Sequence, residues 1–235
     1  MQIIFLFLLF LYPAYPVYAM HIAEGVLEFR WVFFWWLWAI PFIFLGLYRI
    51  QKLKKRNPLF LPLLAAVGAG VFVFSLIPLP VPITGTTSHP TGTGLSCLLL
   101  GVFSTGVISF LSLLIQAVFL GHGGLTTLGA NIVSLGIAGP MFALSVYYLL
   151  KFFKFPLGIR VFFVGLLADL TTYVVTSGQL ALSLVKLQDF WETFMKFLLL
   201  FLPIQLPLAI LEGFLTLGII RYVSIHRPQI VEHLL

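Results

Sequence analysis

The sequence predicts an all-α integral membrane protein of about seven transmembrane helices, with a re-entrant Gly/Thr-rich loop, an outside N-terminus and an inside C-terminus. Of its 235 residues, 61% are hydrophobic and 9% are charged, whereas soluble domains average about 45–50% and about 25%. Several apolar stretches approach the ~20 residues that cross a bilayer. Basic residues also concentrate on one side of a single topology. The composition therefore excludes a soluble enzyme, a disordered tail and a nucleic-acid-binding protein.

Residues 1–19 are expected to be a cleaved signal peptide. The apolar run Ile3–Leu11 is too short to span a bilayer, and two prolines follow it. Val17 and Ala19 fit the small residues at −3 and −1 of a cleavage site, although no Lys or Arg precedes the apolar run. Cleavage leaves one transmembrane domain, 20–235; an uncleaved anchor is the alternative.

Six longer apolar stretches and one short one follow, separated by polar loops. A basic loop, 49–56, separates the first two, and the Gly-rich loops Thr84–Gly94 and Gly121–Asn131 come before and after the next pair. Gln179–Thr193 is a polar, partly amphipathic connector, and two prolines in the last stretch are expected to kink it. The expected spans are Trp31–Tyr48, Leu59–Leu79, a short helix near 92–103, the remaining run to Gly121, Ile132–Leu150, Leu157–Thr176 and Phe194–Val223.

The run Leu95–Gly121 decides the topology, because it forms either one crossing or a short helix followed by a full one. Gly101 interrupts it. One crossing leaves seven basic residues inside and six outside, whereas two crossings leave ten inside and three outside. Because basic residues favour the inner side, two crossings are expected. His21, His89 and His122 then all lie on the outer side.

The short helix has a consequence for the loop before it. From about Gly92 to Phe103 a helix rises only ~18 Å, while the hydrocarbon core is ~30 Å thick. The Thr84–Gly94 loop must therefore dip below the outer surface. Irregular backbone at that depth persists only where it is buried in protein or lines a polar cavity. The sequence thus predicts an outward-facing pocket floored by this loop.

Cleavage after Ala19 would place a histidine second in the mature chain. The α-amine of Met20, the amide nitrogen of His21 and the Nδ1 atom of His21 could then close five- and six-membered chelate rings on one ion. His89, in the sunken loop, could supply a fourth nitrogen. A planar nitrogen set suits Co(II), Ni(II) or Cu(II) better than Mg²⁺ or Ca²⁺, and better than zinc, which prefers tetrahedral sites. The alternative is that His21 is an isolated polar residue.

Four stretches together resemble a known family: the substrate-capturing membrane subunits of cobalt energy-coupling-factor transporters (CbiM type), with the nickel subunits (NikM type) as close relatives. The resemblance covers Met20 to about Tyr222, nearly the whole mature chain. The stretches that carry it are Met20-His21-Ile22 with Glu24-Gly25, Ser88–Gly94 (SHPTGTG), His122–Asn131 (HGGLTTLGAN), and Gln205–Ile210 (QLPLAI) with Glu212-Gly213.

The resemblance implies a metal site made by Met20, His21 and His89, with Co(II) as the transported substrate and Ni(II) as the alternative. The stretch from His122 is closer to the cobalt branch. It also implies a multi-pass protein of the inner membrane. The implied partners are a membrane-coupling transmembrane subunit, two ATP-binding cassette subunits and a small accessory membrane subunit. The chain itself lacks the GxxxxGK[ST] motif, so neither an ATP site nor an enzyme activity of its own is expected.

Other residues allow two interpretations each. His122 is either a residue that orients the ligands or a ligand itself, and Asn131 either bonds to loop carbonyls or caps a helix starting at Ile132. Asp169 and Glu212 lie in spanning segments, where carboxylates are functional candidates or hydrogen-bonded packing groups; we do not assign them to the site. Small residues four apart, including Ala65 and Ala69, serve either a helix contact within the chain or docking to a partner subunit.

Two rival functions remain at the level of the sequence. An intramembrane metalloenzyme could use His89 and His122, but the chain has no HExxH motif and no carboxylate near either histidine on the outer side. A passive channel requires weak binding at several sites, whereas a chelating terminus would trap its ion. Cys97 is the only cysteine, which excludes a disulfide within the chain and a Cys-based zinc site.

Overall fold

The computed structural model describes residues 21–77, 79–80, 87–185 and 187–234. The expected signal peptide, 1–19, and Met20 lie outside these residues, as does most of the expected loop before Ser88. The described helices are α2 (Phe29–Arg56), α3 (Phe60–Ser75), α4 (Thr93–Leu100), α5 (Val102–Phe119), α6 (Leu128–Asn131), the π-helix η1 (Ile132–Ala138), α7 (Gly139–Phe152), α8 (Leu157–Leu184), α9 (Phe190–His226) and α10 (Pro228–Val231).

The protein is an all-α membrane protein. Among the described residues, five helical stretches are long and apolar enough to cross a membrane, namely α2, α5, 128–152, α8 and α9; α3 is apolar but shorter, at 16 residues. The remaining regular elements are the short helices η2 (Leu187–Asp189) and η3 (Glu232–Leu234) and an antiparallel pair of two-residue strands, β1 (Leu79–Pro80) and β2 (Thr87–Ser88). With the short α4, this matches the expected helical architecture.

The run 95–121 is broken where expected. Gly101 has φ 79° and separates α4 from α5, because glycine adopts positive φ without a steric penalty. Residues 89–92 are irregular and buried between other elements, which is the environment that such backbone needs inside a membrane.

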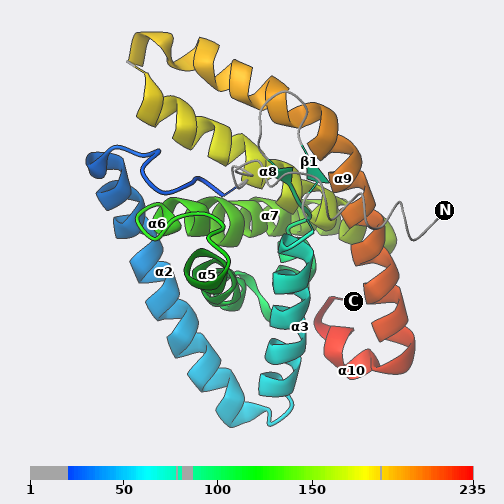
Figure 1. Cartoon of the computed structure of the whole chain (residues 1–235). Coiled ribbons are helices and arrows are strands. Elements are labelled where there is room, and N and C mark those ends of the chain that lie inside the picture. The colour runs from blue at the N-terminus through cyan, green and yellow to red at the C-terminus, as the bar shows by residue number, and fades with distance from the viewer. Residues whose placement is uncertain (1–20, 78, 81–86, 186, 235) are drawn as a thin grey trace, which may run out of the picture.

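The predicted bounds of the connector Gln179–Thr193 are wrong, because much of it is helical. α8 continues to Leu184 and α9 begins at Phe190. The polar side chains there do not end the helix, because the buried Gln179 donates through Nε2 to the Ala130 carbonyl at 3.0 Å. α9 runs through Pro203 and Pro207, and its ribbon changes direction along its length (Figure 1), as prolines cause.

The helices approach one another closely at glycines, which have no side chain to hold them apart. A Cβ on Gly94 of α4 would lie 2.8 Å from the Gly165 Cα of α8, and one on Gly165 would lie 2.9 Å from the Gly213 Cα of α9. Such contacts allow helices to approach each other in a membrane. They bring α4, and the irregular segment before it, against α8 and α9.

The two ends of the helices differ. One end, which we call the histidine end, carries the loops with His21, His89 and His122. At the other end, the basic end, α2 finishes in Lys54, Lys55 and Arg56, and α2 and α3 form the hairpin that points down in Figure 1. The basic residues of α2 therefore lie at the end opposite the histidines, while the wider separation of charge and the side of the membrane on which each end lies stay predictions.

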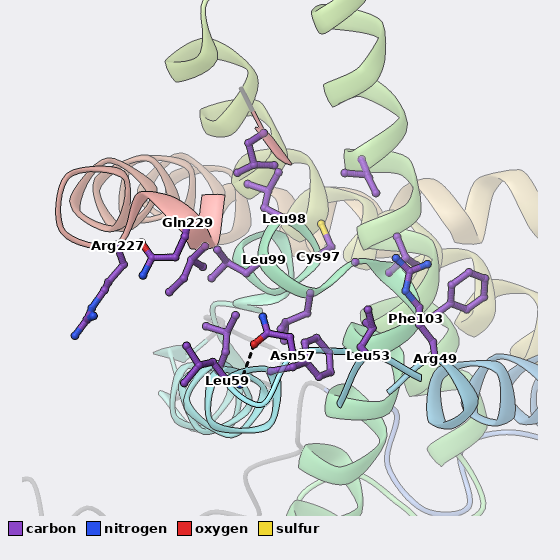
Figure 2. Close-up of a pocket in the computed structure, with 18 of the residues that line it drawn as sticks. Arg49, Leu53, Asn57, Leu59, Cys97, Leu98, Leu99, Phe103, Arg227 and Gln229 are labelled. Atoms are coloured by element: carbon purple, nitrogen blue, oxygen red, sulfur yellow. Dashed lines mark hydrogen bonds between the residues drawn. The ribbon is translucent and has the colours of Figure 1, made fainter. Parts of the chain in front are cut away.

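A cavity of about 860 Å³ lies at the basic end. Figure 2 shows Arg49 and Arg227 at opposite margins, with leucines and Cys97 between them. Both arginines are exposed, as is Asn57. The remaining wall of the cavity comes largely from apolar side chains of α3, α4 and α10.

Candidate metal centre

Three histidines from three separate loops meet at the histidine end. The ring centroids of His21 and His89 are 4.7 Å apart, those of His21 and His122 are 5.0 Å apart, and those of His89 and His122 are 6.3 Å apart. One ligand nitrogen from each ring lies within 4.8 Å of the others. A ligand nitrogen lies about 2.0–2.1 Å from its ion, so neighbouring ligand nitrogens lie about 3 Å apart, and the three rings must move closer together to bind one ion.

His89 has a defined tautomer. Its Nδ1 atom lies 2.8 Å from the carbonyl oxygen of Pro90, which can only accept, so Nδ1 carries the proton and donates. The Nε2 atom is buried and has no hydrogen-bond partner among the described residues. A second hydrogen bond of this kind fixes the orientation of a metal-binding histidine and increases its basicity. Nε2 of His89 is therefore available as a ligand.

His21 is held in the complementary way. Its Nε2 atom lies 3.2 Å from Oε1 of Gln116, and Gln116 Nε2 donates to Ser75 Oγ at 2.7 Å. That second bond fixes the orientation of the amide, so His21 donates from Nε2 and leaves Nδ1 free. Nδ1 is the imidazole atom that a chelate through the chain terminus requires. The sequence analysis missed Gln116, although the one amide side chain within α5 was a signal.

His122 enters the cluster from the loop after α5. Its backbone N–H donates to the Gln116 carbonyl at 3.1 Å, so Gln116 positions two of the histidines. The flanking Gly121 and Gly123 have φ 62° and 88°, which suits a tight turn of glycines. A Cβ on Gly123 would lie 3.1 Å from the His21 Cβ. Nε2 of His122 is buried without a partner among the described residues.

Asn131 fixes the chain next to His21. Its Oδ1 accepts from the Ile22 N–H at 2.9 Å, and its Nδ2 donates to the Ile22 carbonyl at 3.2 Å. Thr127 Oγ1 donates to the same carbonyl. Asn131 therefore bonds to loop backbone. The alternative as a helix cap is wrong, because α6 continues into η1 and Asn131 makes no side-chain cap bond.

Burial keeps these imidazoles neutral. It lowers the pKa of His21 well below its usual value, and the neighbouring His89 and His122 lower it further. Burial likewise lowers the pKa of His89 to about 4, against the opposing effect of its bond to Pro90, and lowers the pKa of His122. At neutral pH the three rings therefore keep the lone pairs that a metal ion needs. No carboxylate joins this group in the described part of the chain.

The remaining candidates take different positions. Met20 lies outside the described residues, so its role stays a prediction. Ala65 and Ala69 are exposed on α3 and are therefore not part of a contact within this chain; docking of a partner there stays a prediction. Asp169 and Glu212 are buried in α8 and α9 and bond to groups around the His89 segment rather than to the imidazoles.

Comparisons with other proteins identify one family. Its model, described as the cobalt uptake substrate-specific transmembrane region (CbiM), matches residues 21–230. The cobalt transport protein CbiM of Nostoc sp. is 46% identical over 215 residues, covering 91% of this chain and 82% of that protein. The putative cobalt transport protein CbiM 1 of Methanosphaerula palustris is 46% identical over 217 residues, covering 92% and 93%.

Two further similarities concern a longer relative and a solved structure. The cobalt transport protein CbiM of Geobacter sulfurreducens is 41% identical over 216 residues, which are 92% of this chain and 62% of that longer protein. The crystal structure of a truncated transition metal transporter superposes with a TM-score of 0.76 over 88% of this chain and 99% of the other, at 22% identity. At that identity, the likeness concerns the fold.

Proposed function

The chain belongs to the CbiM family of cobalt uptake substrate-specific transmembrane regions, and from this premise we propose that it is the substrate-binding membrane subunit of an energy-coupling-factor transporter with Co(II) as its cargo. The observation that carries the proposal is the arrangement of free nitrogens. Nδ1 of His21 and Nε2 of His89 are left without protons by their bonds to Gln116 and Pro90.

Four nitrogens form the proposed ligand set. The mature N-terminus contributes the Met20 amine, the His21 amide and His21 Nδ1, and the buried segment contributes His89 Nε2. His122 lies beside this ligand set and acts either as a fifth nitrogen donor to the ion or as a group that orients the ligand rings. Nitrogen ligands of this kind suit Co(II) and also Ni(II). Nickel is therefore the alternative cargo, and the names of the relatives favour cobalt.

Import requires partners, because the sequence has no ATP-binding motif. We assign this role to a membrane-coupling transmembrane subunit, two ATP-binding cassette subunits and a small accessory membrane subunit, assembled in the inner membrane. The exposed Ala65 and Ala69 of α3 are the proposed contact with the coupling subunit, since small residues let helices approach closely.

The histidine-based metalloenzyme is less well supported. Hydrolysis at a metal needs a proton acceptor besides the metal ligands, and if all three histidines bind the ion, the described group offers no further side chain for that role. The buried imidazoles instead form a closed set of ligands. This environment favours capture of an ion over chemistry on a substrate.

The test is the metal content of protein purified with its native N-terminus. We expect about one Co(II) per chain, lost in both His21→Ala and His89→Ala and kept in His226→Ala, where the histidine is exposed and bonds to the Tyr222 carbonyl. Mass spectrometry of the intact protein should show that the chain begins at Met20. An ion that survives His21→Ala and is lost in His122→Ala would favour the enzyme.

A further inference from the structure

The segment that carries His89 is attached to α8 and α9 on both sides of the histidine. Among the described residues, its imidazole makes one hydrogen bond, to the carbonyl of the adjacent Pro90. The position of Nε2 therefore depends on where the backbone of residues 88–92 is held. Ser88, His89 and Thr91 are each at most 1% exposed, so this holding is done by protein groups.

Glu212 of α9 holds the C-terminal side of the segment. Its Oε2 atom accepts from the Thr91 N–H at 2.7 Å, and its Oε1 atom accepts from the Gly92 N–H and the Thr91 Oγ1, each at 2.8 Å. These donors lie immediately before α4. A carboxylate suits this place because the first N–H groups of a helix lack partners and its N-terminus carries partial positive charge.

Gln205 of α9 holds the N-terminal side. Its Nε2 donates to Asp169 Oδ2 of α8, and its Oε1 accepts from Ser88 Oγ. Because Asp169 accepts, it fixes the orientation of the amide and turns the oxygen toward Ser88. Tyr173 of α8 adds contacts to His89 itself, donating to its carbonyl at 3.2 Å and accepting from its N–H at 3.4 Å.

We propose that Gln205 and Glu212 are positioning residues that place His89 Nε2 at the metal, an inference that rests on the proposed role of His89 as a ligand. The two side chains are seven residues apart on α9, which puts them on one face of the helix. Gln205 bonds to the residue before His89, and Glu212 bonds to the second and third residues after it. The position of α9 thereby sets the position of one metal ligand.

A double-mutant cycle tests the inference, with the dissociation constant for CoCl₂ measured on the purified full chain. We expect Glu212→Gln to weaken binding about 10- to 100-fold, because in either orientation its amide NH₂ replaces an oxygen that accepts from a backbone N–H, so that N–H loses its acceptor. The control Glu192→Gln changes an exposed carboxylate on the same helix, which pairs with Lys196, and should leave binding unchanged. In a His89→Ala background, where only the weaker binding by the proposed N-terminal nitrogens is left to titrate at higher CoCl₂, Glu212→Gln should add less than about twofold, because its effect acts through His89.

Equal weakening by Glu212→Gln in both backgrounds would overturn the inference, because the effect would then be a general loss of structure. If Glu212→Gln does not yield monodisperse protein, the same cycle with Ser88→Ala decides, since this change removes the donor to Gln205 and the hydroxyl that contacts Tyr173 but leaves the Glu212 bonds in place. Unchanged binding in His89→Ala alone would instead contradict the proposed function. The two failures are therefore distinguishable.

Discussion

The histidine end and the cavity at the basic end differ in which groups line them and in how deeply those groups are buried. The cavity has a volume of about 860 Å³, yet its arginines and Asn57 are exposed and most of its wall is apolar. At the histidine end, His21 and His89 are 6% and 1% exposed. Their second nitrogens are fixed by Gln116 and Pro90.

Under the proposed function, donor groups rather than volume mark the candidate metal site. Fixed tautomers and low dielectric surroundings prepare nitrogen lone pairs for a cation. Two exposed arginines at a cavity margin repel a cation and remain solvated. Changes at the histidine end should therefore alter metal binding, and matched changes at the basic end should not.

The largest effect is expected from moving the histidine by one position. Inserting one Ala between Ala19 and Met20, with cleavage still after Ala19, places a second amide in the chelate. We expect Co(II) affinity of the purified protein to fall by more than about 100-fold, the upper range for disturbing a metal site. Expression and monodispersity should be unchanged, and wild-type affinity would contradict a chelate through the N-terminus.

Acid should destabilise the metal-free protein through the histidine end. Burial lowers the pKa of His89 to about 4, from about 6.5 in an unfolded chain. The unfolded chain therefore binds more protons between these values. Stability is full above about pH 6.5 and falls by about 3 kcal/mol as the pH drops to about 4.

Thermal unfolding of Co(II)-free protein in detergent between pH 4 and pH 8 measures this loss. His89→Ala should reduce the slope, while the exposed His226→Ala should keep it. A slope that does not change in His89→Ala would show that other groups cause the acid sensitivity.

Packing of α4 should matter for stability. Gly94→Ala would place a Cβ 2.8 Å from the Gly165 Cα and 2.9 Å from the Val164 carbonyl oxygen, and we expect a loss of about 2 kcal/mol from overpacking. Gly218→Ala, where nothing lies within 4 Å, is the matched control in a helix. Melting temperatures of the two variants give the comparison; equal values would mean that α4 moves away without cost.

A smaller effect is expected from the amide that orients His21. Gln116→Leu roughly keeps the side-chain volume but removes the oxygen that accepts from His21 Nε2. The single proton of the neutral His21 ring can then sit on either Nδ1 or Nε2. Co(II) affinity should fall about tenfold, measured by calorimetry. Gln229→Leu, in the cavity at the basic end, is the control, and an equal change in both would argue against a fixed tautomer.

The smallest effect completes the comparison. Arg49→Gln and Arg227→Gln change the charge at the cavity margins shown in Figure 2. Because neither side chain contacts the histidine cluster in the described structure, Co(II) affinity should stay within about twofold, as for most exposed substitutions. A tenfold change would mean that the two ends are coupled.

The sequence predicted much of the helical order but not its limits. The break at Gly101 follows from the conformational freedom of glycine, a local property. The continuation of α8 through Gln179 was missed because that amide finds a partner on Ala130, which no local pattern reveals. Tertiary contacts override helix-ending tendencies in this way.

Composition, charge distribution and motif spacing were sufficient to determine a helical membrane protein and to single out His21 and His89, because these follow from residue type and order along the chain. Only the tertiary structure decided that His122 joins them, that Gln116 fixes the ring proton of His21, and that Glu212 holds the segment beside His89. The physical reason is that hydrogen bonds between helices far apart in sequence depend on how those helices pack, and packing is a property of the whole fold.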